Sequence, residues 1–159
     1  MTSGEYFKTI KIVHIAIVIG VVLFTIVSLI RRIIGFEPVG YEIDKVLLIL
    51  VPIFVLIGIF ASNFVFKKIL NEIREKSNFK EKMEKYRSAL IIKLALIEGP
   101  AFFAIISFLL TGNYIHLGLT VILIIVLLIY KPNKTKLVNE LELVKKESDL
   151  IYNSESEIL

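Results

Sequence analysis

Four apolar stretches of roughly membrane length constrain the fold of this chain more than any other feature. They lie at residues 12–30, 46–66, 89–110 and 114–130. A hydrocarbon core of about 30 Å requires about 20 apolar residues in a helix. Because 56% of the 159 residues are hydrophobic, a soluble domain of this size could not hide so much apolar surface. The sequence therefore predicts an all-α, polytopic membrane protein whose four transmembrane helices lie within residues 1–132.

The Lys and Arg residues are distributed unevenly between the loops. Fifteen lie in the N-terminal segment, the loop between the second and third stretches, and the tail, whereas the other loops carry three, Arg31, Arg32 and Lys45. Cytoplasmic loops of membrane proteins carry an excess of positive charge. We therefore expect a protein of the inner membrane with both termini in the cytoplasm. The net charge of +4 is then a sign of topology and gives no reason to expect a nucleic-acid partner.

Two cytoplasmic segments are predicted to be helical. Residues 67–88 read as a helical hairpin, in which Asn78 and Glu81 have the spacing of a capping box. In the tail, residues 133–159, a helical face of Leu137, Leu141 and Val144 indicates an amphipathic helix that lies on a surface or binds a partner. Beyond residue 149 we expect a frayed, acidic end.

Glu98 is a carboxylate in the middle of the third apolar stretch, directly before Gly99 and Pro100. An ionised carboxylate without a partner is very unfavourable in hydrocarbon, so Glu98 is expected to be protonated or paired with a cation. Pro100 cannot donate a hydrogen bond to the Leu96 carbonyl, and a helix kink is predicted there. Two interpretations stay open. Glu98 binds a proton or small cation, or its protonated form fixes helix packing.

Three further polar residues are expected at the cytoplasmic level of the helices: Lys93, His14 and Asn63. Lys93 either snorkels towards the headgroups or has an interhelical role with His14 or Glu98. His116 lies near the start of the fourth stretch with no carboxylate close in sequence, so no metal site is expected. No catalytic motif or cofactor-binding motif is present in the sequence, which therefore does not predict an enzyme.

Pairs of small residues spaced four apart occur in the first and third stretches. They are Ala16 with Gly20 and Ala95 with Gly99, a spacing that permits close approach of helices. We expect the two helices to pack together or to pack across a homo-oligomer.

The two pairs coincide when residues 7–30 are aligned with residues 86–109, an offset of 79 positions without a gap. The alignment predicts a parallel duplication of a helical hairpin. Ile19 stands at the position of Glu98, so only the second copy carries the carboxylate.

The run Tyr86-Arg87-Ser88-Ala89, followed by Leu96-Ile97-Glu98-Gly99-Pro100-Ala101 and by Leu109-Leu110-Thr111-Gly112-Asn113, resembles a family of small, uncharacterised bacterial four-helix inner-membrane proteins. That resemblance covers nearly the whole chain and implies no activity. The Leu96–Gly99 segment is also remotely similar to the carboxylate helix of the proteolipid (c-type) subunits of rotary ATPases. This second resemblance implies that Glu98 is an ion-binding carboxylate. The chain departs from that family by lacking a Gly-rich helix and by its long, charged middle loop.

The sequence thus favours a non-enzymatic membrane protein with a protonatable carboxylate at Glu98. Such a protein would be a proton- or cation-binding component of an oligomeric channel, a transporter or a larger complex. The alternative is a structural or assembly protein in which Glu98 is a protonated packing residue and the cytoplasmic segments recruit a partner. The expected partners are the lipid bilayer and either further copies of the chain or another membrane protein.

Overall fold

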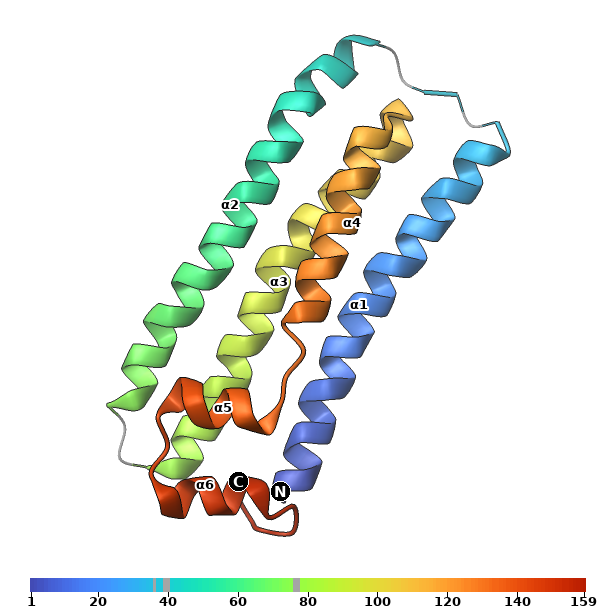
Figure 1. Cartoon of the computed structure of the whole chain (residues 1–159). Coiled ribbons are helices and arrows are strands. Elements are labelled where there is room, and N and C mark those ends of the chain that lie inside the picture. Colours follow the sequence, from blue (N-terminus) through green and yellow to red (C-terminus); the bar gives the residue numbers. More distant parts are fainter. Residues whose placement is uncertain (36, 39–40, 76–77) are drawn as a thin grey trace. The chain divides into compact units, whose positions relative to one another are not determined.

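The computed structural model describes residues 1–35, 37–38, 41–75 and 78–159. Within these residues the chain forms six α-helices and no β-strand, in agreement with the predicted all-α class (Figure 1). The helices are α1 (Ser3–Ile33), α2 (Tyr41–Arg74), α3 (Phe79–Thr111), α4 (Tyr114–Ile129), α5 (Lys134–Leu141) and α6 (Lys145–Tyr152).

Three of these helices are long and apolar enough to cross a membrane, which marks the chain as a membrane protein. They contain 31 to 34 residues and extend beyond the first three predicted stretches at both ends. The fourth predicted stretch corresponds to α4, which has only 16 residues and qualifies only when it is combined with α5, across a bend of 80°. The structure therefore confirms three membrane-length helices. The fourth predicted span stays a prediction.

The described residues divide into two compact units. The first unit contains Met1–Ile15, Asn63–Lys93 and Lys131–Leu159, and the second contains Ala16–Ser62 and Leu94–Tyr130. The tail, which sequence reasoning separated at residue 133, thus belongs to the same unit as the first residues of the chain.

Helix α3 supplies the centre of the second unit. Half of its most apolar window is buried, compared with 22% for α1 and for α2. Two aromatic pairs join it to its neighbours: Phe102 lies 5.6 Å from Phe24 of α1, and Phe103 lies 5.3 Å from Phe54 of α2, measured between ring centroids. The buried face of α3 includes Ile97, Ala101, Ala104, Ile105 and Phe108. This helical spacing of apolar residues explains the packing of α1 and α2 around α3.

The tail closes the first unit against the start of α1. The Met1 ammonium donates to the Leu159 carbonyl at 2.6 Å, and an isolated antiparallel bridge joins Thr2 to Glu157. The Ser3 hydroxyl donates to the Ile151 carbonyl at 2.6 Å, and Ile151 is fully buried. The prediction of a frayed end beyond residue 149 is therefore wrong. Hydrophobic residues in the acidic tail bury themselves within the unit.

The amphipathic face predicted in the tail is used inside the chain. Leu137 and Leu141 are buried, but Val144 is 63% exposed because α5 ends at Leu141. The next residue, Glu142, adopts a left-handed conformation with a φ of 51°, which turns the chain away from the helix. The two buried leucines are consequently not available to a partner in this structure.

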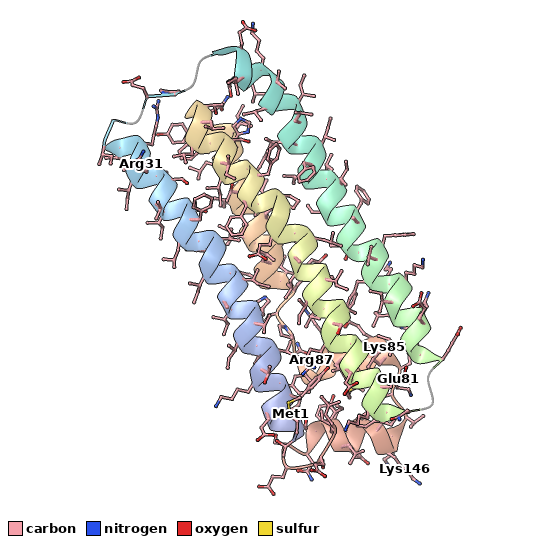
Figure 2. All side chains as sticks on the ribbon, turned by 180° about the vertical axis from the view of Figure 1, so that it is seen from behind. Met1, Arg31, Glu81, Lys85, Arg87 and Lys146 are labelled. Carbon is pink, nitrogen blue, oxygen red and sulfur yellow. The ribbon has the colours of Figure 1, made fainter. Side chains whose placement is uncertain are left out.

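The two helical segments predicted within residues 67–88 are formed by the end of α2 and the start of α3. Residues 76–77 of the predicted hairpin lie outside the described residues. Helix α2 continues to Arg74, and the Asn78 side chain accepts a hydrogen bond from the Lys80 amide at 3.0 Å to cap α3. Glu81 forms an ion pair with Lys85 at 3.3 Å, one helical turn further on (Figure 2). The capping role of Asn78 is thus confirmed.

Candidate functional site

Glu98 lies in the apolar part of α3 with its side chain half-buried. It follows Ile97, which is fully buried, so the carboxylate lies at the border of the buried face of the helix. In the part of the chain that the structure describes, no hydrogen bond or ion pair involves the Glu98 carboxylate. The described residues therefore supply no polar partner for this group.

The helix surface next to Glu98 is open. Ala95 and Gly99 are exposed, and a Cβ atom built on Gly99 meets no heavy atom of a neighbouring element within 4 Å. The same holds for Gly20 of α1, while Ala16 is exposed. The expectation that these glycines bring α1 and α3 of one chain into close contact is therefore wrong. Packing through them across a homo-oligomer stays a prediction.

A different glycine mediates the closest helix approach in the second unit. A Cβ atom built on Gly58 of α2 would overlap the Pro100 ring and would lie 2.8 Å from the Leu96 carbonyl oxygen. Pro100 has no amide hydrogen, so this oxygen lacks its usual helical donor. Because Gly58 has no side chain, the α2 backbone can approach this oxygen closely. Sequence reasoning singled out the proline-freed carbonyl but missed Gly58.

Helix α3 continues through Gly99 and Pro100 without ending, from Phe79 to Thr111. The predicted kink at these residues stays a prediction. What the structure adds is the environment of Pro100, which is buried against α2 rather than open to a polar pocket around Glu98.

The three supporting polar residues lie in the first unit. Lys93 is only 7% exposed, and its ammonium lies 4.2 Å from the centre of the Phe66 ring of α2. This is a cation–π contact between helices. His14 is buried and Asn63 is half-buried. Lys93 thus contacts a neighbouring helix through Phe66, a partner that sequence reasoning missed, and the choice between snorkelling and an interhelical role with His14 or Glu98 stays a prediction.

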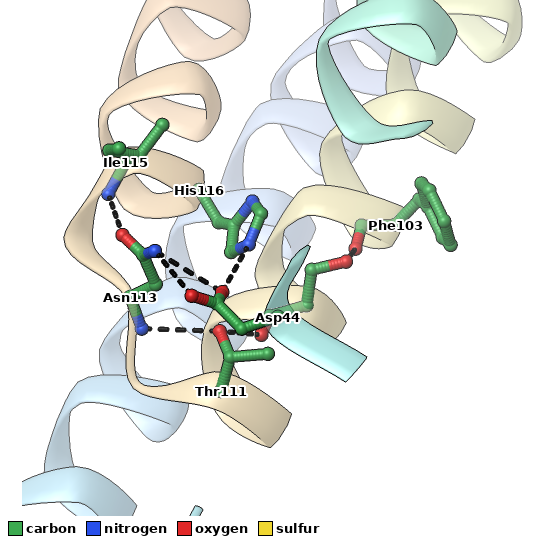
Figure 3. A network of polar contacts seen from close by, with 7 residues as sticks. Asp44, Phe103, Thr111, Asn113, Ile115 and His116 are labelled. Carbon is green, nitrogen blue, oxygen red and sulfur yellow. Dashed lines mark hydrogen bonds and ion pairs between the residues drawn. The ribbon is translucent and has the colours of Figure 1, made fainter. Parts of the chain in front are cut away.

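A polar cluster in the second unit was also missed. The Asn113 amide donates to both carboxylate oxygens of Asp44, at 3.2 and 2.9 Å, and His116 Nε2 lies 3.4 Å from Asp44 Oδ1 (Figure 3). The cluster joins the first turn of α2 to the first turn of α4. No carboxylate was expected beside His116, because Asp44 is remote from it along the chain.

Local sequence explains why these groups face one another. Helix α3 ends at Thr111, and Gly112 takes a φ of 68°, a left-handed conformation that favours glycine. Asn113 then caps α4, because its side-chain oxygen accepts from the Ile115 amide at 3.0 Å while its amide group remains free to bind Asp44. Asp44 lies in the first turn of α2, where a negative charge is favourable.

His116 is fully buried, and neither ring nitrogen has a well-formed hydrogen bond within the described part of the chain. Its contact with Asp44 is long, and the Asp44 side chain retains 17% exposure. Among the described residues there is no group of three or more His, Cys, Asp or Glu side chains that could hold a metal ion. The geometry therefore suits a polar link between two helix ends.

In comparisons with known proteins, no family model, no curated protein and no solved structure matches this chain. The two family resemblances of the sequence accordingly stay predictions. Function has to be argued from the site itself.

Proposed function

We propose that this chain is a non-enzymatic membrane protein that works as part of an oligomeric assembly, with Glu98 as a protonatable carboxylate at the contact between copies. One observation carries the proposal. Glu98 lies half-buried in the apolar part of α3 without a polar partner in the described chain. Since an unpaired carboxylate in hydrocarbon is strongly unfavourable, the missing partner is a bound proton or cation, or a group from a second chain.

The proposal includes four membrane crossings. The hydrogen bond between Met1 and Leu159 and the bridge between Thr2 and Glu157 hold the two ends of the sequence together. Ends on one side of a membrane require an even number of crossings, whereas α1, α2 and α3 alone would give three. The fourth crossing is α4, whose 16 residues span about 24 Å at 1.5 Å per residue. The excess of Lys and Arg in the first unit supports a cytoplasmic location for both ends.

The open surface beside Glu98 supports a second copy of the chain as the missing element. Ala95 and Gly99 carry no bulky side chain, so another helix can approach the α3 backbone closely there. If two copies met through this same face, each Glu98 would lie near its counterpart. Two carboxylic acids can then share hydrogen bonds while protonated, or bind one cation when ionised.

Two functions fit this arrangement. In the first, Glu98 exchanges its proton or cation and the assembly is a channel or transporter component. In the second, the carboxyl group stays protonated and only stabilises the assembly. The open Gly99 surface next to Glu98 favours neither over the other, because both require a docked helix.

The test uses the full chain in detergent and in proteoliposomes, with Glu98→Gln, Glu98→Leu and the control Glu42→Gln. Glu42 is a suitable control because its side chain is 86% exposed at the start of α2. For an exchanging site, a hydrophobic carbodiimide labels the wild type, and Glu98→Gln abolishes proton or cation flux but preserves the oligomer. For a packing role, Glu98→Gln changes nothing and Glu98→Leu dissociates the oligomer. If Glu98→Leu leaves the oligomeric state intact and no flux depends on Glu98, both functions fail.

A further inference from the structure

The first unit contains a cavity of about 350 Å³ beside the N-terminal part of α1, which is within the size range of ligand pockets. It is formed by one face of α1 together with the start of α5 and the tail. Its lining residues are Gly4, Phe7, Lys8, Lys11, Ile12, Ile15, Lys134 and Ser154.

Three lysines contribute positive charge to this cavity. Lys8 and Lys11 are exposed and lie one turn apart on α1, and Lys134 belongs to α5. Among the described residues that line the cavity, none is acidic. Three lysines without a carboxylate among the lining residues give this cavity a charge that suits a phosphate group.

The position of Lys134 is fixed by neighbouring groups. Its ammonium donates to the Tyr152 carbonyl at 3.2 Å and to the Ser154 hydroxyl at 3.0 Å, and it lies 5.7 Å from the centre of the Phe7 ring. The Gly4 amide donates to the Ser154 carbonyl at 2.9 Å, which holds the tail against α1. A Cβ atom at Gly4 would lie 3.1 Å from that carbonyl oxygen, a tight contact that would require the tail to shift slightly.

Further along α1, the lining of the cavity is apolar. Ile12 and Ile15 are 57% and 50% exposed, and they begin the first membrane-length stretch of the sequence. The cavity therefore combines a cationic end with an apolar end at the start of a membrane-length helix. A soluble phosphate compound would gain nothing from exposed isoleucines, whereas a lipid would place its acyl chain on them.

We infer that this cavity binds the phosphate headgroup of an anionic phospholipid, with the lysines on the phosphate and the acyl chain along Ile12 and Ile15. The proposal rests on the membrane character of the chain and is independent of Glu98. Basic pockets of this kind at the membrane surface bind anionic lipid headgroups.

The experiment measures lipid binding by the full chain, purified without lipid in a neutral detergent, by native mass spectrometry. The probes are phosphatidylglycerol, phosphatidylcholine and soluble glycerol phosphate. The variants are Lys8→Gln/Lys11→Gln and the triple variant that adds Lys134→Gln. The control variant is Lys68→Gln/Lys145→Gln/Lys146→Gln, which removes three exposed charges outside the cavity.

We expect the wild type to bind phosphatidylglycerol at least about tenfold more tightly than phosphatidylcholine, and the triple variant to lose that affinity by about 100-fold, at about 1 kcal/mol per lysine. The control should stay within about twofold. Replacing Lys134 removes hydrogen bonds and could disturb the fold of the first unit. The double variant avoids this, because Lys8 and Lys11 have no hydrogen bond or ion pair among the described residues. An equal loss of phosphatidylglycerol affinity in the control variant would show that the cavity is not the binding site. Unchanged affinity in the double variant would show the same. Equal affinity for soluble glycerol phosphate overturns the lipid assignment.

Discussion

Gly58 of α2 lies directly against Pro100 of α3, so that no side chain larger than hydrogen fits between the two helices. We expect Gly58→Ala to lower the free energy of unfolding by about 1–3 kcal/mol, because the Pro100 ring and the Leu96 carbonyl belong to a rigid helix and cannot move aside easily. The measurement is unfolding of the purified chain in mixed detergent micelles.

The matched control for this prediction is Gly118→Ala, a glycine inside α4 with open space around its Cα atom. Replacing such a glycine favours the helix by about 0.5–1 kcal/mol. The two substitutions should therefore have opposite signs. Equal effects would show that the close contact at Gly58 is not what limits stability.

Asp44 holds the ends of α2 and α4 together, and its removal should be costly. In Asp44→Ala, the Asn113 amide and the buried His116 both lose their carboxylate, and we expect a loss of about 1–3 kcal/mol. Hydrogen exchange at the start of α4 should accelerate at the same time. Glu42→Ala, two residues earlier, removes only an exposed pair with Lys45 and should change stability by less than about 0.5 kcal/mol. If Asp44→Ala is as stable as the wild type, the cluster of Asp44, Asn113 and His116 does not stabilise the contact between α2 and α4.

The Tyr86 hydroxyl donates to Glu140 Oε2 at 2.6 Å and so ties α3 to α5 inside the first unit. Arg74 adds two hydrogen bonds to the Glu140 carbonyl oxygen, at 3.0 and 2.8 Å. Tyr86→Phe should lower stability by about 1.5–3 kcal/mol, because the bond has a charged acceptor. It should also make the tail more sensitive to protease. Tyr152→Phe, at a side chain that is 51% exposed, is the control and should leave both properties unchanged.

The absence of cysteine makes the chain a ready background for testing membrane topology. We expect single cysteines at Glu5 and Lys146 to react with a membrane-impermeant maleimide only from the cytoplasmic side. A cysteine at Ile34, which is 69% exposed, should react only from the opposite side. Labelling of Glu5→Cys and Lys146→Cys from opposite sides would contradict four crossings.

Sequence reasoning succeeded where a single helix carries the information. The apolar stretches located α1, α2 and α3, and the Asn78 cap fixed the start of α3. The predicted stretches were shorter than the helices because hydropathy marks only the part that can lie in lipid. Charged residues continue the helical backbone into the first unit.

It failed where the contact joins distant segments. No periodicity relates Asp44 to His116, and a glycine at position 58 is unremarkable until Pro100 is seen against it. The acidic tail was misjudged because two well-placed isoleucines, Ile151 and Ile158, outweigh its charge.

The predicted duplication stays a prediction, because the hydrogen bond shared by its two copies also occurs elsewhere in the chain, at Thr25 and Thr120. The Ser28 hydroxyl donates to the Phe24 carbonyl at 2.9 Å, and at the offset of 79 residues the Ser107 hydroxyl donates to the Phe103 carbonyl at 2.8 Å. Both serines are buried. Equivalent residues of α1 and α3 thus use the same local hydrogen bond within each helix.

The hydrogen bond from Met1 to Leu159 joins two residues that lie 158 positions apart in the sequence. In a chain of four crossings, failure to insert any one helix would leave Thr2 and Glu157 on opposite sides, where their bridge cannot exist. On the proposed topology, the tail of a wrongly threaded chain would lose its packing against the start of α1, and we expect such a chain to be cleaved more readily by proteases.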